Sequence, residues 1–298
     1  MMRIGIDLGG TKTEIAVLDQ SGEIVYRQRI PTPQGDYQGA LKTIADLIRQ
    51  AENHITTEAM IGVATPGAIS PASGLMKNAN STVLNGQAFD KDLSALLKRP
   101  IRIANDADCF ALSEAVDGAG ANAATVFGVI VGTGTGGGVV VNQKLLSGPN
   151  AIAGEWGHNP LPWPRADELP GHRCYCGQDG CIETFLSGPG MARQYQSSFQ
   201  ESLTAKEIVD KAEQGDQQAE HYMQLYEDRM ARALASIINV IDPHVIVLGG
   251  GLSNIQRVYE NVPRLWGRYV FSDRVDNQLV QARHGDSSGV RGAAWLWD

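Results

Sequence analysis

The chain has 298 residues, enough for two domains, and its 43% hydrophobic and 19% charged residues are typical of a soluble globular protein. A net charge of −8 argues against a nucleic-acid-binding surface, although backbone amides could still hold a nucleotide. No apolar stretch approaches the roughly 20 residues of a membrane helix, and no signal-peptide cleavage site follows the short apolar run at the N-terminus. We therefore expect a cytoplasmic protein with neither membrane nor nucleic-acid partners.

The first half of the sequence predicts three strands joined by tight turns, followed by alternating helices and strands. The spacing of Leu41, Ile44 and Ile48, for example, is helical. In chain order we expect strands at 3–7, 13–18 and 23–30, a helix at 37–51, a strand at 60–64, a helix at 91–98, a strand at 101–104 and a helix at 107–116.

The second half repeats the opening pattern of strand, Gly/Thr turn, strand, turn, strand. It has predicted strands at 125–131, 139–141 and 144–146, with a glycine-rich break at 132–138. Helices are expected at 204–214 and 217–242, strands at 245–248 and 279–282, and a last helix at 288–296. The repeat indicates a duplicated domain, although Gly-rich turns between strands are common enough for coincidence. We predict an N-terminal domain at 1–118, a C-terminal domain at 119–287 and a final helix, about 288–298, that packs back on the first domain.

Glycine-rich turns follow three of the apolar strands. Glycine lets the backbone approach a phosphate and point its N–H groups at the oxygens. One such turn is most often only a tight connection, and none fits a Walker or dinucleotide motif. Together they predict a nucleotide site whose candidate residues are Gly9, Gly10, Thr11, Lys12, Gly132, Thr133, Gly134, Gly249, Gly250 and Gly251.

Three of the four cysteines cluster at Cys174, Cys176 and Cys181, while Cys109 stands alone. Without a secretion signal a disulfide framework is not expected. The cluster therefore indicates either a metal site or three reduced structural cysteines.

Several stretches of the sequence resemble a known family. The run Asp-Leu-Gly-Gly-Thr-Lys at 7–12 resembles the first phosphate motif of sugar kinases in the actin/hexokinase superfamily. The run Gly-Glu-Trp-Gly-His at 154–158, followed by Cys-x-Cys-Gly-x-x-Gly-Cys-x-Glu at 174–183, is similar to the signature of the ROK family, which contains bacterial sugar kinases and sugar-responsive repressors. The resemblance covers essentially the whole chain. It implies a duplicated actin-like (ribonuclease H-like) α/β ATPase fold, with two domains around a central cleft, and a homodimer.

The resemblance also implies a structural Zn²⁺ bound by His158, Cys174, Cys176 and Cys181. Three thiolates and one imidazole suit tetrahedral zinc, and the glycines of the knuckle allow its tight turn. His172 is a rival ligand because it is close in the sequence.

Asp106 is the candidate catalytic residue. Where a strand ends and a helix begins, a helix cap is the ordinary interpretation of an aspartate. The resemblance instead implies that Asn105 and Asp106 bind the sugar and that Asp106 is the general base, because a sugar hydroxyl needs a proton acceptor to attack phosphorus. Mg²⁺ is expected at the terminal phosphates of ATP, with Asp7 holding one of its waters or only stabilising its loop. The implied sugar ligands are Gly67, Asn80, Asn105, Asp106, Glu155, His158 and Glu183.

Stretches at 77–82, 156–163 and 284–295 are similar to bacterial fructokinases that also accept mannose. We therefore expect ATP-dependent phosphorylation of the 6-hydroxyl of fructose, and also of mannose, with glucokinase and N-acetylhexosamine kinase as alternatives. A sugar-responsive repressor is disfavoured because the phosphate motif begins at Gly5, which leaves no room for a DNA-binding domain, and because the phosphate turns look intact. An actin-like structural or chaperone ATPase is disfavoured because the Glu/His/Cys constellation suits a sugar.

Overall fold

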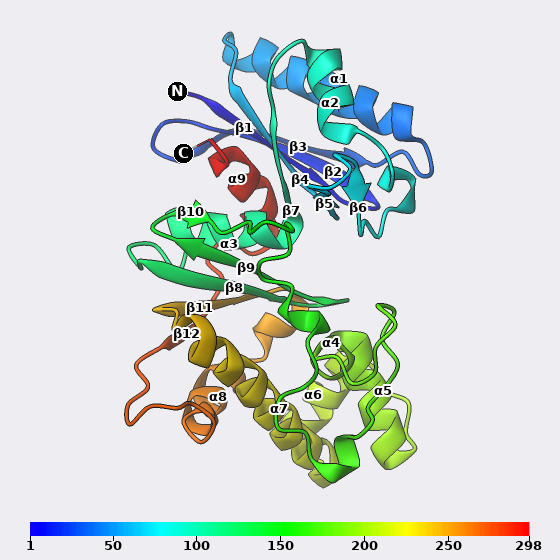
Figure 1. Ribbon diagram of the computed structural model, residues 1–298, viewed down its shortest axis with the longest axis vertical. Helices are drawn as coiled ribbons and strands as arrows, with labels where there is room; N and C mark the ends of the chain where they lie inside the picture. The colour runs from blue at the N-terminus through cyan, green and yellow to red at the C-terminus, as the bar shows by residue number, and fades with distance from the viewer. Residues whose placement is uncertain (298) are drawn as a thin grey trace. The chain divides into compact units, whose positions relative to one another are not determined.

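A computed structural model describes residues 1–297, and for Asp286 only the backbone (Figure 1). The structure is α/β and contains two five-stranded sheets and one short hairpin. Residue 298, the end predicted for the last helix, lies outside the described residues. Within the described chain, no helix combines the length and hydrophobicity that crossing a membrane would require.

The first sheet has the strand order β3-β2-β1-β4-β7. The first three strands form the expected antiparallel meander, whereas β1 pairs in parallel with β4 and β4 with β7. The carboxyl ends of these parallel strands therefore lie at one edge of the sheet. The bounds are β1 Arg3–Leu8, β2 Lys12–Leu18, β3 Ile24–Pro31, β4 Met60–Thr65 and β7 Arg102–Asn105.

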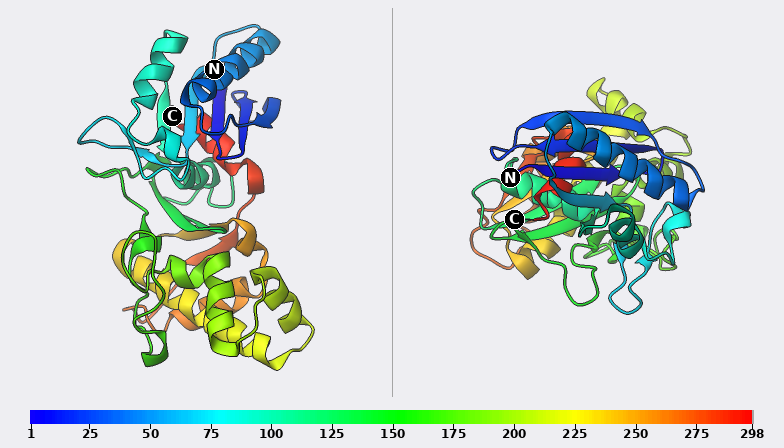
Figure 2. Two further views of the ribbon diagram at one scale, coloured as in Figure 1. Left: turned by 90° about the vertical axis from the view of Figure 1, so that its right-hand side faces the viewer. Right: turned by 90° about the horizontal axis from the view of Figure 1, so that it is seen from above.

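The two faces of this sheet carry different side chains. Ile4 and Ile6 are buried in one hydrophobic cluster with the apolar face of helix α1 (Tyr37–Ile55). The other face carries Gly5 of β1 and Gly62 of β4. A Cβ added to either glycine would lie 1.8 Å from a backbone oxygen of helix α9 (Ser288–Trp295). Glycine at these positions thus lets α9 lie directly on the strands. Figures 1 and 2 show α1 and α9 on opposite faces of the sheet.

Helix α3 (Asp106–Val116) also packs against α9 at a glycine. A Cβ on Gly292 of α9 would lie 1.6 Å from the carbonyl oxygen of Cys109 in α3. The indole N–H of Trp297 donates to the carbonyl of Ile61 at 2.7 Å, which makes it a packing residue. The remaining elements before residue 123 are β5 Ala68–Ile69, β6 Met76–Lys77, the 3₁₀ turn η1 Thr82–Leu84 and α2 Phe89–Leu97.

The second sheet has the order β10-β9-β8-β11-β12, in which β11 is parallel to both β8 and β12. Its strands are β8 Thr125–Val131, β9 Thr135–Val141, β10 Lys144–Leu145, β11 Val245–Gly249 and β12 Gln278–Gln281. The prediction that 132–138 lies outside the strands was wrong, since β9 begins at Thr135. A Cβ on Gly137 would lie 2.9 Å from Trp156, and one on Gly138 would lie 2.8 Å from the Ala111 side chain. The absence of side chains at these two positions therefore lets Trp156 and Ala111 pack directly against β9.

Five helices lie between residues 183 and 282. The predicted helices at 204–214 and 217–242 correspond to α6 and α7, and each begins with a side-chain cap, Thr204 and Asp216 respectively. Helices α5 and α8 were not predicted. The bounds are α4 Glu183–Leu186, α5 Gly188–Phe199, α6 Ala205–Glu213, α7 Gln217–Ile241 and α8 Val258–Trp266, with 3₁₀ turns η2 Trp156–His158, η3 Ala166–Glu168, η4 Gly251–Asn254 and η5 Gly285–Ser287.

The chain divides into two compact units. Unit 1 comprises Met1–Asn122, Gly138–Ala153 and the chain from Arg283, and unit 2 comprises Ala123–Gly137 and Gly154–Ala282. The expected domain boundaries at 118 and 287 lie near two of these divisions and stay predictions. The grouping of 138–153 with unit 1 had no signal in the sequence.

Candidate functional site

The first glycine turn joins β1 to β2 in unit 1. Its amide at Gly9 donates to the carbonyl of Lys12 at 3.0 Å, and a Cβ on Gly9 would lie 2.8 Å from that oxygen, so the turn needs glycine there. Gly10 borders open space, because no atom lies within 4 Å of where its Cβ would be. The Thr32 hydroxyl donates to the carbonyl of Gly9 at 2.8 Å, and the Gln34 amide donates to that of Gly10. The turn is thus held in shape by side chains from outside it.

Asp7, at the end of β1, is a half-buried carboxyl group with other acids nearby. Burial and the negative charges of Asp106 and Glu14 raise its pKa to about 7, although Arg29 acts in the opposite direction. A cation at this edge of the sheet would therefore be attracted to a concentration of negative charge.

Asn105, rather than Asp106, caps helix α3. The Asn105 side chain accepts a hydrogen bond from the Asp108 amide at 2.6 Å. Asp106 is the first helical residue and is exposed, and one of its oxygens accepts the Ala107 amide at 2.8 Å. The capping alternative for Asp106 is therefore wrong, because its neighbour fills that position.

Gly67 and Asn80 lie on two connections held against each other. A Cβ on Gly67 would lie 2.5 Å from the carbonyl of Lys77, so this approach requires glycine. The Asn85 side-chain amide bonds both the N–H and the carbonyl of Ala79, each at 2.9 Å. Asn80 is thereby presented, exposed, on a fixed loop.

The second glycine turn, in unit 2, is bonded to Glu183. The amide of Gly132 donates to the carbonyl of Gly134 at 2.9 Å. The amide of Thr135 donates to the Glu183 carboxylate at 2.9 Å, and a Cβ on Gly134 would lie 2.9 Å from the same oxygen. Glu183, which the resemblance assigns to the sugar, is thus also a structural partner of a predicted phosphate turn.

A cavity of about 790 Å³ opens beside two of the glycine turns of unit 2. The third turn needs its glycine, since Gly250 has φ +81° and a Cβ there would lie 2.5 Å from the Val131 carbonyl. The turns were predictable from the sequence, but the cavity walls, which come from α5, α6 and η4, were not. The lining residues are Gly132, Thr133, Gly188, Pro189, Ala192, Thr204, Ala205, Lys206, Val209, Asp210, Glu213, Gly251, Leu252, Asn254 and Ile255.

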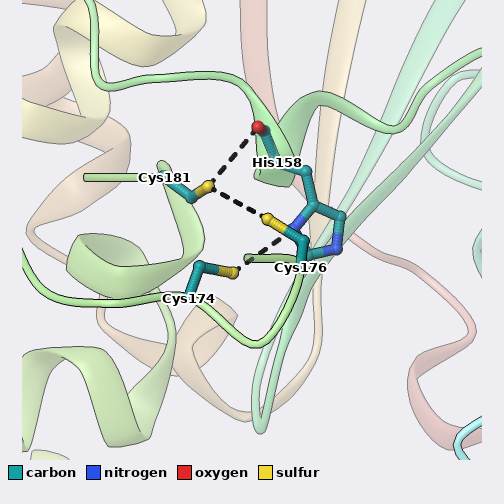
Figure 3. Close-up of side chains that lie close together, drawn as sticks. All are labelled: His158, Cys174, Cys176 and Cys181. Atoms are coloured by element: carbon teal, nitrogen blue, oxygen red, sulfur yellow. Dashed lines mark hydrogen bonds between the residues drawn. The ribbon is translucent and has the colours of Figure 1, made fainter. Parts of the chain in front are cut away.

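The structure brings together the four predicted metal ligands. One ligand atom from each of His158, Cys174, Cys176 and Cys181 lies within 4.8 Å of all the others. The Nδ1 atom of His158 is 3.5 Å from the Cys174 sulfur, and the sulfurs of Cys176 and Cys181 are 3.6 Å apart. Figure 3 shows this ring nitrogen turned toward the sulfurs and the other nitrogen turned away from them.

This donor set fits a zinc ion. Burial, above all, and the neighbouring thiols raise the pKa of Cys181 well above its usual range, so a divalent cation is needed to favour the thiolate form. Gly177 and Gly180 have φ values of +94° and +70°, the left-handed conformation expected for the knuckle's turns. The rival ligand His172 is not in the group, and its Nε2 atom lies 3.4 Å from the Ser197 hydroxyl.

Sequence reasoning missed Tyr175. Its hydroxyl lies 2.9 Å from Nε2 of His158, and the two rings are perpendicular with centroids 5.0 Å apart. Desolvation of the hydroxyl and the negative charges of Glu183, Cys174 and Glu155 raise the pKa of Tyr175 to about 12. The charges of two acids that the resemblance assigns to the sugar therefore act on this hydroxyl. The available signal was an aromatic residue between two predicted metal ligands.

Comparison with known proteins explains the combination of glycine turns, acids and cysteine knuckle. The sequence matches the ROK family over residues 3–298. This chain belongs to the ROK family. The N-acetyl-D-glucosamine kinase of Yersinia enterocolitica is 39% identical to it over 299 residues, which is 99% of each chain.

Solved structures of the family share the fold. The crystal structure of the ROK hexokinase from Thermus thermophilus has a TM-score of 0.88 and 30% identity, covering 99% of this chain and 97% of that one. The ROK family glucokinase from Streptomyces griseus, in complex with glucose and AMPPNP, has a TM-score of 0.78 and 25% identity, covering 99% of both chains. These matches confirm the predicted two-domain actin-like fold class. The expected closeness to fructokinases is not supported, because the curated relatives at 38–40% identity are N-acetyl-D-glucosamine kinases.

Proposed function

We propose that this ROK family member is an ATP-dependent sugar kinase that phosphorylates the 6-hydroxyl of N-acetyl-D-glucosamine. The observation that carries this proposal is the 39% identity, over 99% of both chains, to an N-acetyl-D-glucosamine kinase. The N-acetylhexosamine alternative thus replaces fructose as the preferred substrate.

The unit 2 cavity is the proposed site for the nucleoside. Its volume of about 790 Å³ is in the range of small-molecule pockets, and apolar side chains such as Val209 and Ile255 offer walls for a base. Gly132, Thr133 and Gly251 line the same cavity, and the backbone amides of Thr133 and Gly251 would suit phosphate oxygens, whereas that of Gly132 already donates to the carbonyl of Gly134. The bound AMPPNP of the Streptomyces griseus glucokinase supports ATP as the donor.

Asp106 is the proposed general base. Its exposed position at the start of α3 lets a carboxylate orient a sugar hydroxyl and accept its proton. Mg²⁺, when bound with ATP, would supply charge neutralisation at the phosphates. The proposed role of Asp7 is to hold a water of that ion, because Asp7 lies in the charge field of Asp106.

The proposed sugar ligands are Gly67, Asn80, Asn105, Glu155, His158 and Glu183. Their carboxylate, amide and imidazole groups provide the donors and acceptors that a polyol needs. The zinc proposed at His158, Cys174, Cys176 and Cys181 has four protein ligands and therefore a structural role. A homodimer, implied by the family resemblance, is also proposed.

The deciding experiment is a coupled ATPase assay of the purified protein with N-acetylglucosamine, N-acetylmannosamine, glucose, fructose and mannose. We expect the highest kcat/KM with N-acetylglucosamine. A clear preference for fructose would overturn the substrate assignment. Sugar binding without any sugar-dependent ATP turnover would overturn the kinase and favour a sugar-responsive binding protein.

A further inference from the structure

Both ring nitrogens of His158 already have a partner. Nδ1 faces the sulfur cluster, 3.5 Å from Cys174, and Nε2 lies 2.9 Å from the Tyr175 hydroxyl (Figure 3 shows the first contact). With a metal on Nδ1, the proton of the neutral imidazole is on Nε2. Nε2–H then donates to the hydroxyl oxygen of Tyr175. The group that would meet a sugar hydroxyl is therefore bonded to a side chain of the protein itself.

The backbone that carries Tyr175 is fixed, whereas its side chain is not. Tyr175 lies between Cys174 and Cys176, both in the metal cluster. The turn is closed by hydrogen bonds from the amide of Cys174 to the carbonyl of Gln178 at 2.9 Å and from the amide of Gly177 to that of Cys174 at 3.1 Å. Tyr175 itself is 83% exposed. Rotation of one side chain is enough to break the contact with His158.

The Tyr175 hydroxyl is chemically similar to the group it would exclude. A neutral phenol hydroxyl, like a sugar hydroxyl, has one donor and can accept from Nε2–H. Either hydroxyl can therefore accept the same hydrogen bond.

We propose that, in the free protein, the Tyr175 hydroxyl occupies the place at His158 Nε2 that a sugar hydroxyl takes in the complex. The substrate binds by displacing the Tyr175 side chain, which rotates toward solvent on its fixed turn. Tyr175 is then a specificity-determining residue, since a sugar binds well only if its hydroxyl replaces this hydrogen bond. The inference rests on the proposed function, because it requires that His158 face the sugar.

The test is the Tyr175→Phe variant, which keeps the ring and removes the competing hydroxyl. Because a net hydrogen bond no longer has to be broken, calorimetry should show N-acetylglucosamine binding roughly two- to tenfold tighter than wild type. KM for the sugar should fall by the same factor, while kcat, KM for ATP and zinc content stay unchanged. Tyr26→Phe is the matched control, since the Tyr26 hydroxyl bonds Gln28 at 2.6 Å on β3, and its sugar affinity should equal that of wild type.

The possible outcomes separate the two proposals. Unchanged sugar affinity in Tyr175→Phe would show that the hydroxyl does not compete with the substrate. Weaker affinity would show that Tyr175 binds the sugar instead of giving way to it. Either result overturns the inference while the kinase assignment stands. A wild-type protein that binds none of the tested sugars would overturn the proposed function, and the inference with it.

Discussion

At the scale of single residues, the surroundings of Asp106 and Asp7 assign them different tasks. Asp106 is exposed at the start of α3, whereas Asp7 is half-buried and its pKa is raised to about 7. Because the Asp106 charge contributes to that shift, the two groups are electrostatically coupled. Removal of one charge should therefore be detectable at the other.

Asp106→Asn keeps the shape of the side chain and removes the proton acceptor. We expect kcat to fall by roughly 10² to 10⁴ with sugar affinity nearly retained. The pKa of Asp7 should also move down toward its usual range, which carboxyl NMR titration would detect. Steady-state kinetics and sugar calorimetry measure the first two effects. Asp46→Asn on the exposed face of α1 is the control, and near-normal kcat in Asp106→Asn would remove this residue from the mechanism.

Gly10 offers a test of the first phosphate turn because its surroundings are open. A valine there would meet no protein atom within 4 Å of its Cβ, so the fold should tolerate it. We expect Gly10→Val to raise KM for ATP at least about tenfold, as crowding of a phosphate would, with the melting temperature unchanged. Gly267→Val, at another open position, should leave KM for ATP as it is. Normal ATP affinity in Gly10→Val would make this an ordinary turn.

At the scale of elements, the cysteine knuckle connects two proposed sites. Glu183 follows Cys181 by two residues and accepts the Thr135 amide of the second glycine turn at 2.9 Å. The knuckle and this turn are therefore joined through Glu183.

Cys176→Ser should therefore lose the zinc and raise KM for the sugar most, with a smaller rise in KM for ATP. Cys176 is the exposed member of the cluster, so the change removes a ligand without opening the core. Metal analysis and both KM values provide the measurement. Cys109→Ala, outside the cluster, should keep its zinc. An active wild type that contains no zinc would contradict the metal assignment itself.

The connection 159–173 is anchored on α7 by Glu168, which is buried between two arginines. Its carboxylate accepts the Arg229 and Arg232 side chains at 2.8 and 2.7 Å. Burial alone would raise the pKa of Glu168, but hydrogen bonds from Arg232, the Arg165 amide and Arg229 outweigh it and lower the pKa to about 2. This carboxylate thus stabilises the fold fully above about pH 4.5, and the contribution is lost as pH falls toward 2.

Glu168→Gln should cost about 3 kcal/mol at pH 7, because buried Arg229 and Arg232 lose a counter-charge, although Arg232 keeps Asp228 at 3.0 Å. Urea unfolding measured from pH 7 to pH 3 would show a shallower acid limb in the variant than in the wild type. Glu260→Gln, in an exposed i,i+4 pair with Arg264, is the control and should change little. Parallel acid limbs in Glu168→Gln and wild type would show that this carboxylate does not govern acid stability.

At the scale of the whole molecule, the sequence predicted best those elements whose residue pattern lies within one continuous stretch of the chain. The meander at the N-terminus and helix α7 were predictable because each depends on residues close together in the chain, whereas the four metal ligands were expected from the family resemblance. Helices α5 and α8 were missed, since Gly188, Pro189 and Pro263 look like helix breakers although Pro189 lies in a first turn. The cavity walls arise from folding and have no local signal, and the position of Tyr175 between two predicted metal ligands did not indicate that it would contact His158.

The packing of α9 against Gly5 of β1 and Gly62 of β4 has a consequence for folding during translation. Strand β1, Arg3–Leu8, has one face shaped for helix α9, Ser288–Trp295, which is translated much later. No side chain at Gly5 or Gly62 can fill the place of that helix. Unit 2 ends at Ala282, so all of its residues leave the ribosome before α9 does. Unit 1 is therefore begun before unit 2 and completed after it, and a nascent chain must keep the sheet of unit 1 unfinished until α9 has emerged.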